Sequence, residues 1–218
     1  MERNVERTVR VLRELEPQNP DLVEIRFDLM KSISTISEVR DATDRPLIAT
    51  NRRRDQGGFF SGTEGIRLAT LTQAAREAFH YVDVELKTKN VSETVRRLKQ
   101  HGSKVIVSYH NRNCTPSQNA LESILAREKR AGADICKIVG TAKSYTDSLR
   151  CLMFVNKHAR GAKLVCFAMG KLGIPSRVLS PLFGAYFTFA SYSSGRETAS
   201  GQLPIENLRT LYKEFRAA

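Results

Sequence analysis

Lys104-Val105-Ile106-Val107-Ser108-Tyr109 is a largely apolar run of strand length, and it ends at a histidine, His110. The run Asp134-Ile135-Cys136-Lys137-Ile138-Val139 has the same character, and the amphipathic stretch from Ser117 to Ala131 between the two runs predicts a helix. A strand, a helix and a second strand in this order predict two parallel strands joined by a crossover helix. This unit decides the fold class that we expect for the chain.

The same alternation continues along the chain in both directions. Further helices are predicted at Val5 to Glu16, Gly65 to Ala78, Val91 to His101 and Lys143 to His158. Including the two above, strands are predicted at Leu22 to Leu29, Pro46 to Asn51, Tyr81 to Leu86, Lys104 to Tyr109, Asp134 to Val139, Ala162 to Ala168 and Ala185 to Ala190. Gly102, Gly132 and Gly161 follow three of the helices, where glycine relieves a left-handed turn. We expect one α/β domain over residues 1–218.

Two architectures are compatible with this alternation, a TIM-type (β/α)8 barrel and an open doubly wound sheet. A barrel needs eight strands. The sequence shows seven clear ones, and the first is not evident because the chain opens with a helical segment. Glu24, Arg26 and Asp28 share one face of their predicted strand, as do Asp83 and Glu85. Both faces of a parallel sheet are covered, so these polar side chains need a polar interior, which favours the barrel.

Composition narrows the class of protein. Of the 218 residues, 41% are hydrophobic and 27% are charged, which is typical of a globular protein. No run approaches the roughly 18 apolar residues of a membrane span, and the charged N-terminus lacks an apolar signal core. The four cysteines lack metal-ligand spacing, so we expect no structural zinc and no disulfide framework. We expect a cytoplasmic protein without a membrane partner.

The formal net charge of +12 leaves open a basic module that binds nucleic acid. However, the basic residues are dispersed in short groups such as Arg52-Arg53-Arg54 and Arg96-Arg97, and no recognition helix, finger or aromatic RNA-binding motif accompanies them. We therefore expect no nucleic-acid partner. The charge also suits an anionic small-molecule substrate, although salt screens such attraction beyond about 8–10 Å.

Two ionisable residues lie where strand cores are normally apolar. Lys137 is inside a buried-type strand, where low-dielectric surroundings favour a neutral amine that attacks carbonyl carbon. His110 is the one histidine of four that follows a predicted strand, at the edge where parallel α/β proteins place catalysis. Because one strand-helix-strand unit separates them, we expect the pair on adjacent strands. The pair predicts Schiff-base chemistry, and a lysine that extends its amine to solvent at a strand end is the structural alternative.

Beyond these two residues, the chain resembles the type I 3-dehydroquinate dehydratases, the Schiff-base enzymes of the shikimate pathway. The resemblance extends from about Asp21 to Gln202. Its motifs occur in the family's order and spacing: Leu22 to Asp28, Thr50-Asn51-Arg52 with Gly57-Gly58, Asp83 to Leu86, Ser108-Tyr109-His110, Gly132 to Ile138, Met169-Gly170-Lys171, Ser176-Arg177, Phe183-Gly184 with Thr188-Phe189, and Gly201-Gln202.

The resemblance implies a role for each matching residue. Lys137 would form an iminium with the C3 carbonyl, and His110 would remove a proton from C2 and later protonate the departing C1 hydroxyl. Arg177 matches the carboxylate-binding arginine, and Glu24, Arg26 and Arg52 match the residues that hold the substrate hydroxyls and order the pocket. Thr198 and Gln202 match lid residues. Gln56 departs from the pattern, since much of the family has a glutamate there that partners the catalytic histidine.

We therefore expect a hydro-lyase that converts 3-dehydroquinate to 3-dehydroshikimate and water without metal or organic cofactor, in aromatic amino-acid biosynthesis. Another class I Schiff-base barrel of the aldolase type is the alternative enzyme, although the late loops show no evident phosphate cradle. Family members commonly pair, so a homodimer is a possible assembly.

Overall fold

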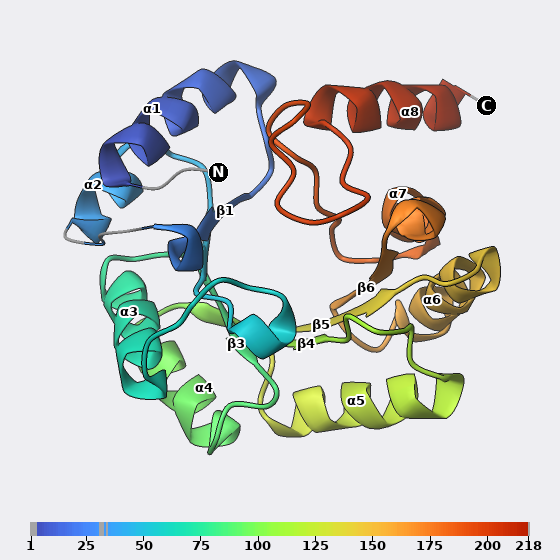
Figure 1. The fold of residues 1–218 in the computed structure, drawn as a ribbon, viewed down its shortest axis with the longest axis horizontal. Coiled ribbons are helices and arrows are strands. Elements are labelled where there is room, and N and C mark those ends of the chain that lie inside the picture. The colour runs from blue at the N-terminus through green and yellow to red at the C-terminus, as the bar shows by residue number, and fades with distance from the viewer. Residues whose placement is uncertain (1–3, 31–32, 34, 218) are drawn as a thin grey trace. The chain divides into compact units, whose positions relative to one another are not determined.

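The computed structural model describes residues 4–30, 33 and 35–217 (Figure 1). Its chain divides into two compact units, and each is described by itself. The N-terminal unit comprises residues 2–110 and 124–136, and the C-terminal unit comprises residues 111–123 and 137–218, together with residue 1. The boundary falls within helix α5 (Gln118–Arg130) and within strand β5 (Ile135–Thr141), so both elements contribute to both units.

Four parallel strands form the sheet of the N-terminal unit: β1 (Val23–Arg26), β2 (Leu47–Thr50), β3 (Tyr81–Glu85) and β4 (Lys104–His110). They lie in chain order, β1-β2-β3-β4. Arg26 is opposite Thr50 in the first pair, and Glu85 is opposite Ser108 in the third. Since the strands are parallel, their polar carboxyl ends meet at one edge of the sheet.

The helices of this unit are α1 (Val5–Leu15), α2 (Ile36–Asp41), α3 (Glu64–Arg76) and α4 (Val91–Gln100). Three 3-10 turns accompany them: η1 (Glu16–Gln18), η2 (Phe27–Leu29) and η3 (Arg54–Gln56). Helix α1 begins at the N-cap Asn4, whose side chain accepts a hydrogen bond from the Arg7 N–H at 2.9 Å. Helix and strand side chains such as Leu71, Val84 and Val107 make up the buried core.

The C-terminal unit contains most of β5, its neighbour β6 (Leu164–Met169), and the crossover helix α6 (Tyr145–His158). After β6 the chain continues through η4 (Lys171–Gly173), α7 (Ile174–Leu179), η5 (Ser180–Phe183) and α8 (Ile205–Ala217). Buried residues of β6 and α6, among them Val165, Phe154 and Val155, contribute to the core of this unit.

Most predicted elements are confirmed with shifted bounds: β4 and β5 extend beyond their predicted ends, to His110 and Thr141, and several others are shorter. The strand predicted at Leu22 to Leu29 ends at Arg26, where η2 begins. Left-handed backbone is confirmed at Gly102 and Gly132, both with φ +90°, but Gly161 is not in that conformation. No strand precedes α1 in the described residues 4–30, as the sequence indicated.

The seventh predicted strand, Ala185 to Ala190, is wrong, so the described residues hold six strands. Its aromatic composition favours a strand, but its contacts are those of a packed loop. Phe187 and Phe189 meet edge to face with ring centroids 5.3 Å apart, and the Thr188 hydroxyl donates to the backbone oxygen of Arg177 at 2.7 Å. Ring packing, a side-chain bond to α7 and one backbone bond, from the Tyr186 N–H to the Leu164 oxygen of β6 at 2.9 Å, hold this segment, and they do not make a strand ladder.

Candidate active site

Arg26 and Glu24, two residues of the expected site, lie on β1 in the N-terminal unit. Arg26 binds both carboxylate oxygens of Asp28, at 2.8 Å from Nε and 2.6 Å from Nη2. The Glu24 carboxylate accepts a hydrogen bond from the Thr50 hydroxyl on β2 at 2.8 Å. Bidentate pairing fixes the plane of the Arg26 guanidinium, so the strand end presents an oriented group.

Arg52 lies two residues after the end of β2, in a group of buried charges. Its Nη2 donates to Asp83 on β3 at 2.6 Å and its Nη1 donates to Ser108 on β4 at 2.6 Å. Glu85 is 3.3 Å from Nη1. Burial opposes a charged guanidinium, but Asp83 and Glu85 outweigh it and raise the pKa of Arg52 above its ordinary value. The polar face of β3 therefore carries buried, paired side chains, as expected, whereas Glu24 and Arg26 on β1 are paired but half-buried.

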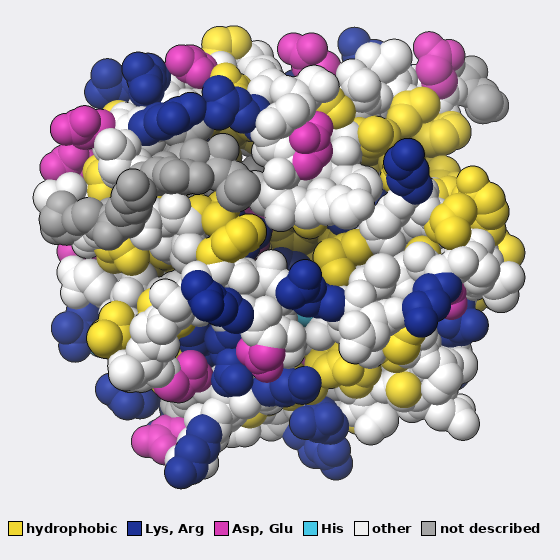
Figure 2. All heavy atoms as spheres, viewed as in Figure 1, with side chains coloured by type: hydrophobic (Ala, Val, Ile, Leu, Met, Phe, Trp, Pro, Cys, Tyr) yellow, Lys and Arg dark blue, Asp and Glu magenta, His cyan; other side chains and the backbone are white. Residues whose placement is uncertain are grey.

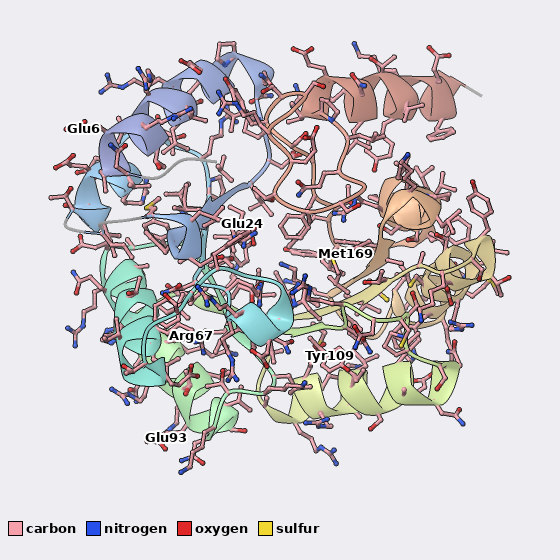
Figure 3. All side chains as sticks on the ribbon, viewed as in Figure 1. Glu6, Glu24, Arg67, Glu93, Tyr109 and Met169 are labelled. Carbon is pink, nitrogen blue, oxygen red and sulfur yellow. The ribbon has the colours of Figure 1, made fainter. Side chains whose placement is uncertain are left out.

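Arg67, a residue of α3, belongs to the same group of charges. Its guanidinium donates to Glu85 at 2.5 Å and to both oxygens of Glu64, at 2.8 and 2.7 Å. Figure 3 labels Arg67 on α3 and Glu24 on β1, within the same unit. We call Arg52, Arg67, Asp83, Glu85 and Ser108 the arginine cluster. Sequence reasoning missed Arg67, because an arginine inside an amphipathic helix is ordinarily exposed.

His110 is the last residue of β4, one residue beyond the predicted strand end, so its expected place at the end of a strand is confirmed. Its backbone N–H donates to the side-chain oxygen of Gln56 at 3.0 Å, and Gln56 is 2% exposed. The Gln56 amide nitrogen is 3.3 Å from the backbone oxygen of Asp55. Gln56 therefore ties the turn after β2 to the histidine through the main chain.

Lys137 is on β5 in the C-terminal unit and is 4% exposed, which confirms a buried position. Its Nζ is 4.2 Å from the centroid of the Phe189 ring. An aromatic face attracts an ammonium group and also excludes water from it. The amine is thus held away from bulk solvent, which rules out the alternative of a lysine that extends to solvent.

Arg177 is on α7 and is 1% exposed. Its guanidinium carbon is 4.2 Å from the centroid of the Phe167 ring of β6, and its Nη2 donates to the backbone oxygen of Ser200 at 3.4 Å. A stacked guanidinium retains in-plane N–H groups for a carboxylate. The aromatic partners Phe167 and Phe189 carried no sequence signal that separates them from ordinary core residues.

Thr198 and Gln202 lie together in the loop between Ser191 and Pro204. The Gln202 side-chain oxygen accepts from the Thr198 N–H at 2.7 Å and from the Ala199 N–H at 3.2 Å. Ser200 accepts from the Gly170 N–H at 3.2 Å, which docks this loop against the end of β6. Gln202 therefore organises its own loop through its carbonyl oxygen.

The two units thus each gather a set of the expected residues. Glu24, Arg26, Arg52 and His110 belong to the N-terminal unit, and Lys137, Arg177, Thr198 and Gln202 belong to the C-terminal unit. Among the described residues, no group of three or more His, Cys, Asp and Glu is placed to hold a metal ion. None of the helices in the described part of the chain is both long and apolar enough to cross a membrane.

This chain combines an α/β fold with a solvent-shielded lysine on one strand, a histidine at the end of the preceding strand, and buried arginines. The combination is typical of enzymes that form an imine with a carboxylated ketone. Comparisons with known proteins identify the family within this class. The family model described as type I 3-dehydroquinase matches residues 1–217. This chain belongs to that family.

Individual relatives agree with the family match. A 3-dehydroquinate dehydratase of Dehalococcoides mccartyi is 37% identical over 190 residues, which are 87% of this chain and 84% of the relative. A 3-dehydroquinate dehydratase of Methanosarcina barkeri is 31% identical over 218 residues, covering 95% of this chain and 90% of the relative. The resemblance and the hydro-lyase class predicted from the sequence are confirmed.

A solved structure extends the agreement to the fold. The 3-dehydroquinate dehydratase of Geobacillus kaustophilus superposes with a TM-score of 0.92 at 27% identity, over 99% of this chain and 88% of that one. This match confirms the predicted α/β class of TIM type.

Proposed function

We propose that this chain dehydrates 3-dehydroquinate to 3-dehydroshikimate through an imine on Lys137. The observation that carries the proposal is the Lys137 amine, which is 4% exposed on β5 and lies against Phe189 in a chain that belongs to the type I 3-dehydroquinase family. The same membership favours dehydration over the aldolase-type alternative.

The chemical steps follow from the groups available. The Lys137 amine adds to the C3 carbonyl and water leaves, which forms an iminium that withdraws electrons from C2. His110 removes the C2 proton to form an enamine, and general-base help of this kind contributes about 10²–10⁴-fold. The enamine electrons then expel the C1 hydroxyl, which takes the proton from His110 and leaves as water. Hydrolysis of the conjugated iminium releases the product and restores the lysine.

The remaining site residues hold the substrate in this proposal. Arg177, stacked on Phe167, binds the substrate carboxylate. Glu24, Arg26 and Arg52 bind its hydroxyl groups, and their fixed partners Thr50, Asp28 and Asp83 support that role. Thr198 and Gln202 form the lid loop. No metal or organic cofactor takes part in these steps.

Trapping of the imine tests the proposal. The protein is incubated with 3-dehydroquinate and sodium borohydride, digested, and analysed by peptide mass spectrometry. We expect one reduced adduct on Lys137 and loss of activity, and no adduct when either substrate or borohydride is left out. Lys137→Ala is the matched control, which we expect to stay folded and to form no adduct. Full turnover with an unmodified Lys137 would contradict the mechanism.

We also infer that two copies of the chain associate. Tyr145, Leu149 and Met153 recur every fourth residue on α6 and are 63%, 60% and 62% exposed. Residues four apart share one helix face, so they form an apolar stripe. Figure 2 shows hydrophobic side chains gathered over the part of the C-terminal unit that holds α6, α7 and α8. A twofold dimer places the same patch of both copies in contact, and a stripe centred on Leu149 suits that arrangement.

Two further expectations remain proposals. We propose that residues 1–218 act as a single domain, because α5 and β5 each contribute to both compact units. We also propose a cytoplasmic location, supported by the free thiols of Cys136 and Cys151, which are typical of a reducing compartment.

A further inference from the structure

We propose that Arg67 is a positioning residue of the active site. Through Glu85 it balances the buried charge around Arg52 and fixes the placement of the Arg52 side chain. The inference rests on the proposed function, in which Arg52 binds the substrate. No family motif named above includes Arg67, which lies on α3 and not at a strand end.

Burial makes Arg67 unusual for a helix residue. It is 0% exposed, and its guanidinium donates to Glu85, Glu64, the Thr88 hydroxyl at 3.0 Å and the backbone oxygen of Asn51 at 3.3 Å. A buried guanidinium is costly unless it is fully hydrogen-bonded. Two of these partners adjoin Arg52: Asn51 precedes it in the chain and Glu85 pairs with it.

Glu85 is the link between the two arginines. One of its oxygens is 2.5 Å from Arg67 Nη1, and the other is 3.3 Å from Arg52 Nη1. The second oxygen also accepts the backbone N–H of Arg53 at 3.1 Å. Arg67 thus orients a carboxylate that holds both the guanidinium of Arg52 and the main chain immediately after it.

The charges of this cluster balance. Arg52 and Arg67 supply two positive charges, and Asp83 and Glu85 supply two negative charges, all on side chains that are 5% exposed or less. Glu64 is outside this balance because its side chain is 38% exposed and solvated. Without Arg67 the buried group carries a net charge of −1, and Glu85 has Arg52 as its remaining close cation.

Two effects on the substrate follow. Arg52 would move toward Glu85 and lose donors for the substrate hydroxyls, and the added negative charge would repel an anionic substrate. Both effects weaken binding, whereas the bond changes are assigned to Lys137 and His110 in the proposed function. We therefore infer that Arg67 controls KM more than kcat.

A double-mutant cycle tests this inference. Steady-state formation of 3-dehydroshikimate is measured for wild type, Arg67→Met, Glu85→Gln and the double variant. Removal of one partner of a buried charge pair leaves the other uncompensated, and we expect Arg67→Met to raise KM by about tenfold or more with kcat within about threefold. Since Arg67→Met/Glu85→Gln restores electrical balance, we expect its KM to be lower than that of Arg67→Met.

Conservative and unrelated variants separate positioning from general destabilisation. Arg67→Lys keeps the charge, and we expect a KM between those of wild type and Arg67→Met. Leu12→Ala removes a buried side chain of α1 that lies outside the cluster, so it should lower the melting temperature without changing KM. If Arg67→Met does not fold, Arg67→Lys and Glu85→Gln are compared in its place. Arg67→Lys keeps the charge balance and Glu85→Gln loses it, so the inference then requires the two variants to have unequal KM values.

The outcomes are distinguishable. Absence of turnover by wild type would overturn the proposed function. Turnover by wild type, together with an unchanged KM in folded Arg67→Met, would overturn only the role of Arg67. A fall in kcat with unchanged KM, or equal KM values in Arg67→Met and the double variant, would also overturn it.

Discussion

At the scale of single residues, aromatic rings contact two basic residues of the proposed site, Lys137 and Arg177. Lys137 Nζ is 4.2 Å from the centroid of the Phe189 ring, and the guanidinium carbon of Arg177 is 4.2 Å from that of Phe167. Phe167 and Phe189 are themselves in edge-on contact, with centroids 6.2 Å apart. One aromatic pair therefore supports both Lys137 and Arg177, and we expect a change at either ring to affect both.

Replacement of Arg177 tests its proposed contact with the substrate carboxylate. Hydrogen bonds to charged groups are worth about 1.5–3 kcal/mol, and we expect Arg177→Ala to lower kcat/KM by about 10–100-fold. Steady-state kinetics with 3-dehydroquinate checks this. Arg150→Ala is the control, because Arg150 pairs with Asp147 on α6 and lies outside the proposed site. An unchanged kcat/KM in folded Arg177→Ala would remove Arg177 from the site.

At the scale of elements, local contacts at its N-terminus secure helix α6. Helix α6 begins with a capping box in which Ser144 and Asp147 exchange side-chain and backbone hydrogen bonds. Asp147 accepts from the Lys143 N–H at 2.8 Å and pairs with Arg150 at 2.6 Å. Burial opposes the charged carboxylate, but these contacts outweigh it and lower its pKa below the ordinary value.

The direction of that shift predicts a pH dependence of stability. A carboxyl whose pKa is lower in the folded chain stabilises the fold above its unfolded pKa, and the contribution is lost as the pH falls through the folded pKa. We expect Asp147→Asn to reduce the free energy of unfolding at pH 7 by about 0.5–2 kcal/mol, the usual worth of a helix cap. The difference from wild type should shrink below about pH 4.

Urea unfolding curves between pH 7 and pH 3 check this prediction. Asp44→Asn, at an exposed position, is the control for loss of a negative charge. A stability difference that is constant down to pH 3 would show that the ionised carboxylate of Asp147 is not its source.

At the scale of the whole molecule, the exposed stripe on α6 bears on assembly. Tyr145, Leu149 and Met153, each about 60% exposed on one helix face, form an apolar cluster of the kind that interaction surfaces use. The sequence pattern did not reveal the stripe. Because α6 also buries Leu152, Phe154 and Val155, apolar residues recur on more than one side of the helix.

A charge within the stripe tests dimer formation. We expect sedimentation equilibrium of the wild type to give twice the mass of one chain, and Leu149→Glu to shift the population toward monomer because pairing would bury two like charges. Gln100→Glu, exposed on α4, adds a negative charge elsewhere and should leave the mass unchanged. A wild type that remains monomeric at high concentration would contradict the inference.

The sequence by itself determined the alternation of β1 to β6 with helices α3 to α6, the placement of His110 at a strand end and the burial of Lys137, but it did not show α2 or α8. These properties follow from the spacing of apolar residues along a short segment, which local periodicity records. The motifs also predicted the family, which the comparisons confirm.

Only the tertiary structure decided which partners these residues have. Gln56 and the His110 N–H are 54 positions apart, Arg52 and Ser108 are 56 apart, and Arg67 and Glu85 are 18 apart. The sheet brings these distant residues together. Since periodicity describes only residues close in the chain, no periodic pattern predicts such pairs. The segment at Ala185 to Ala190 shows the same limit of sequence-based prediction. Its composition predicts a strand, but ring packing and a hydrogen bond to α7 hold it as a loop.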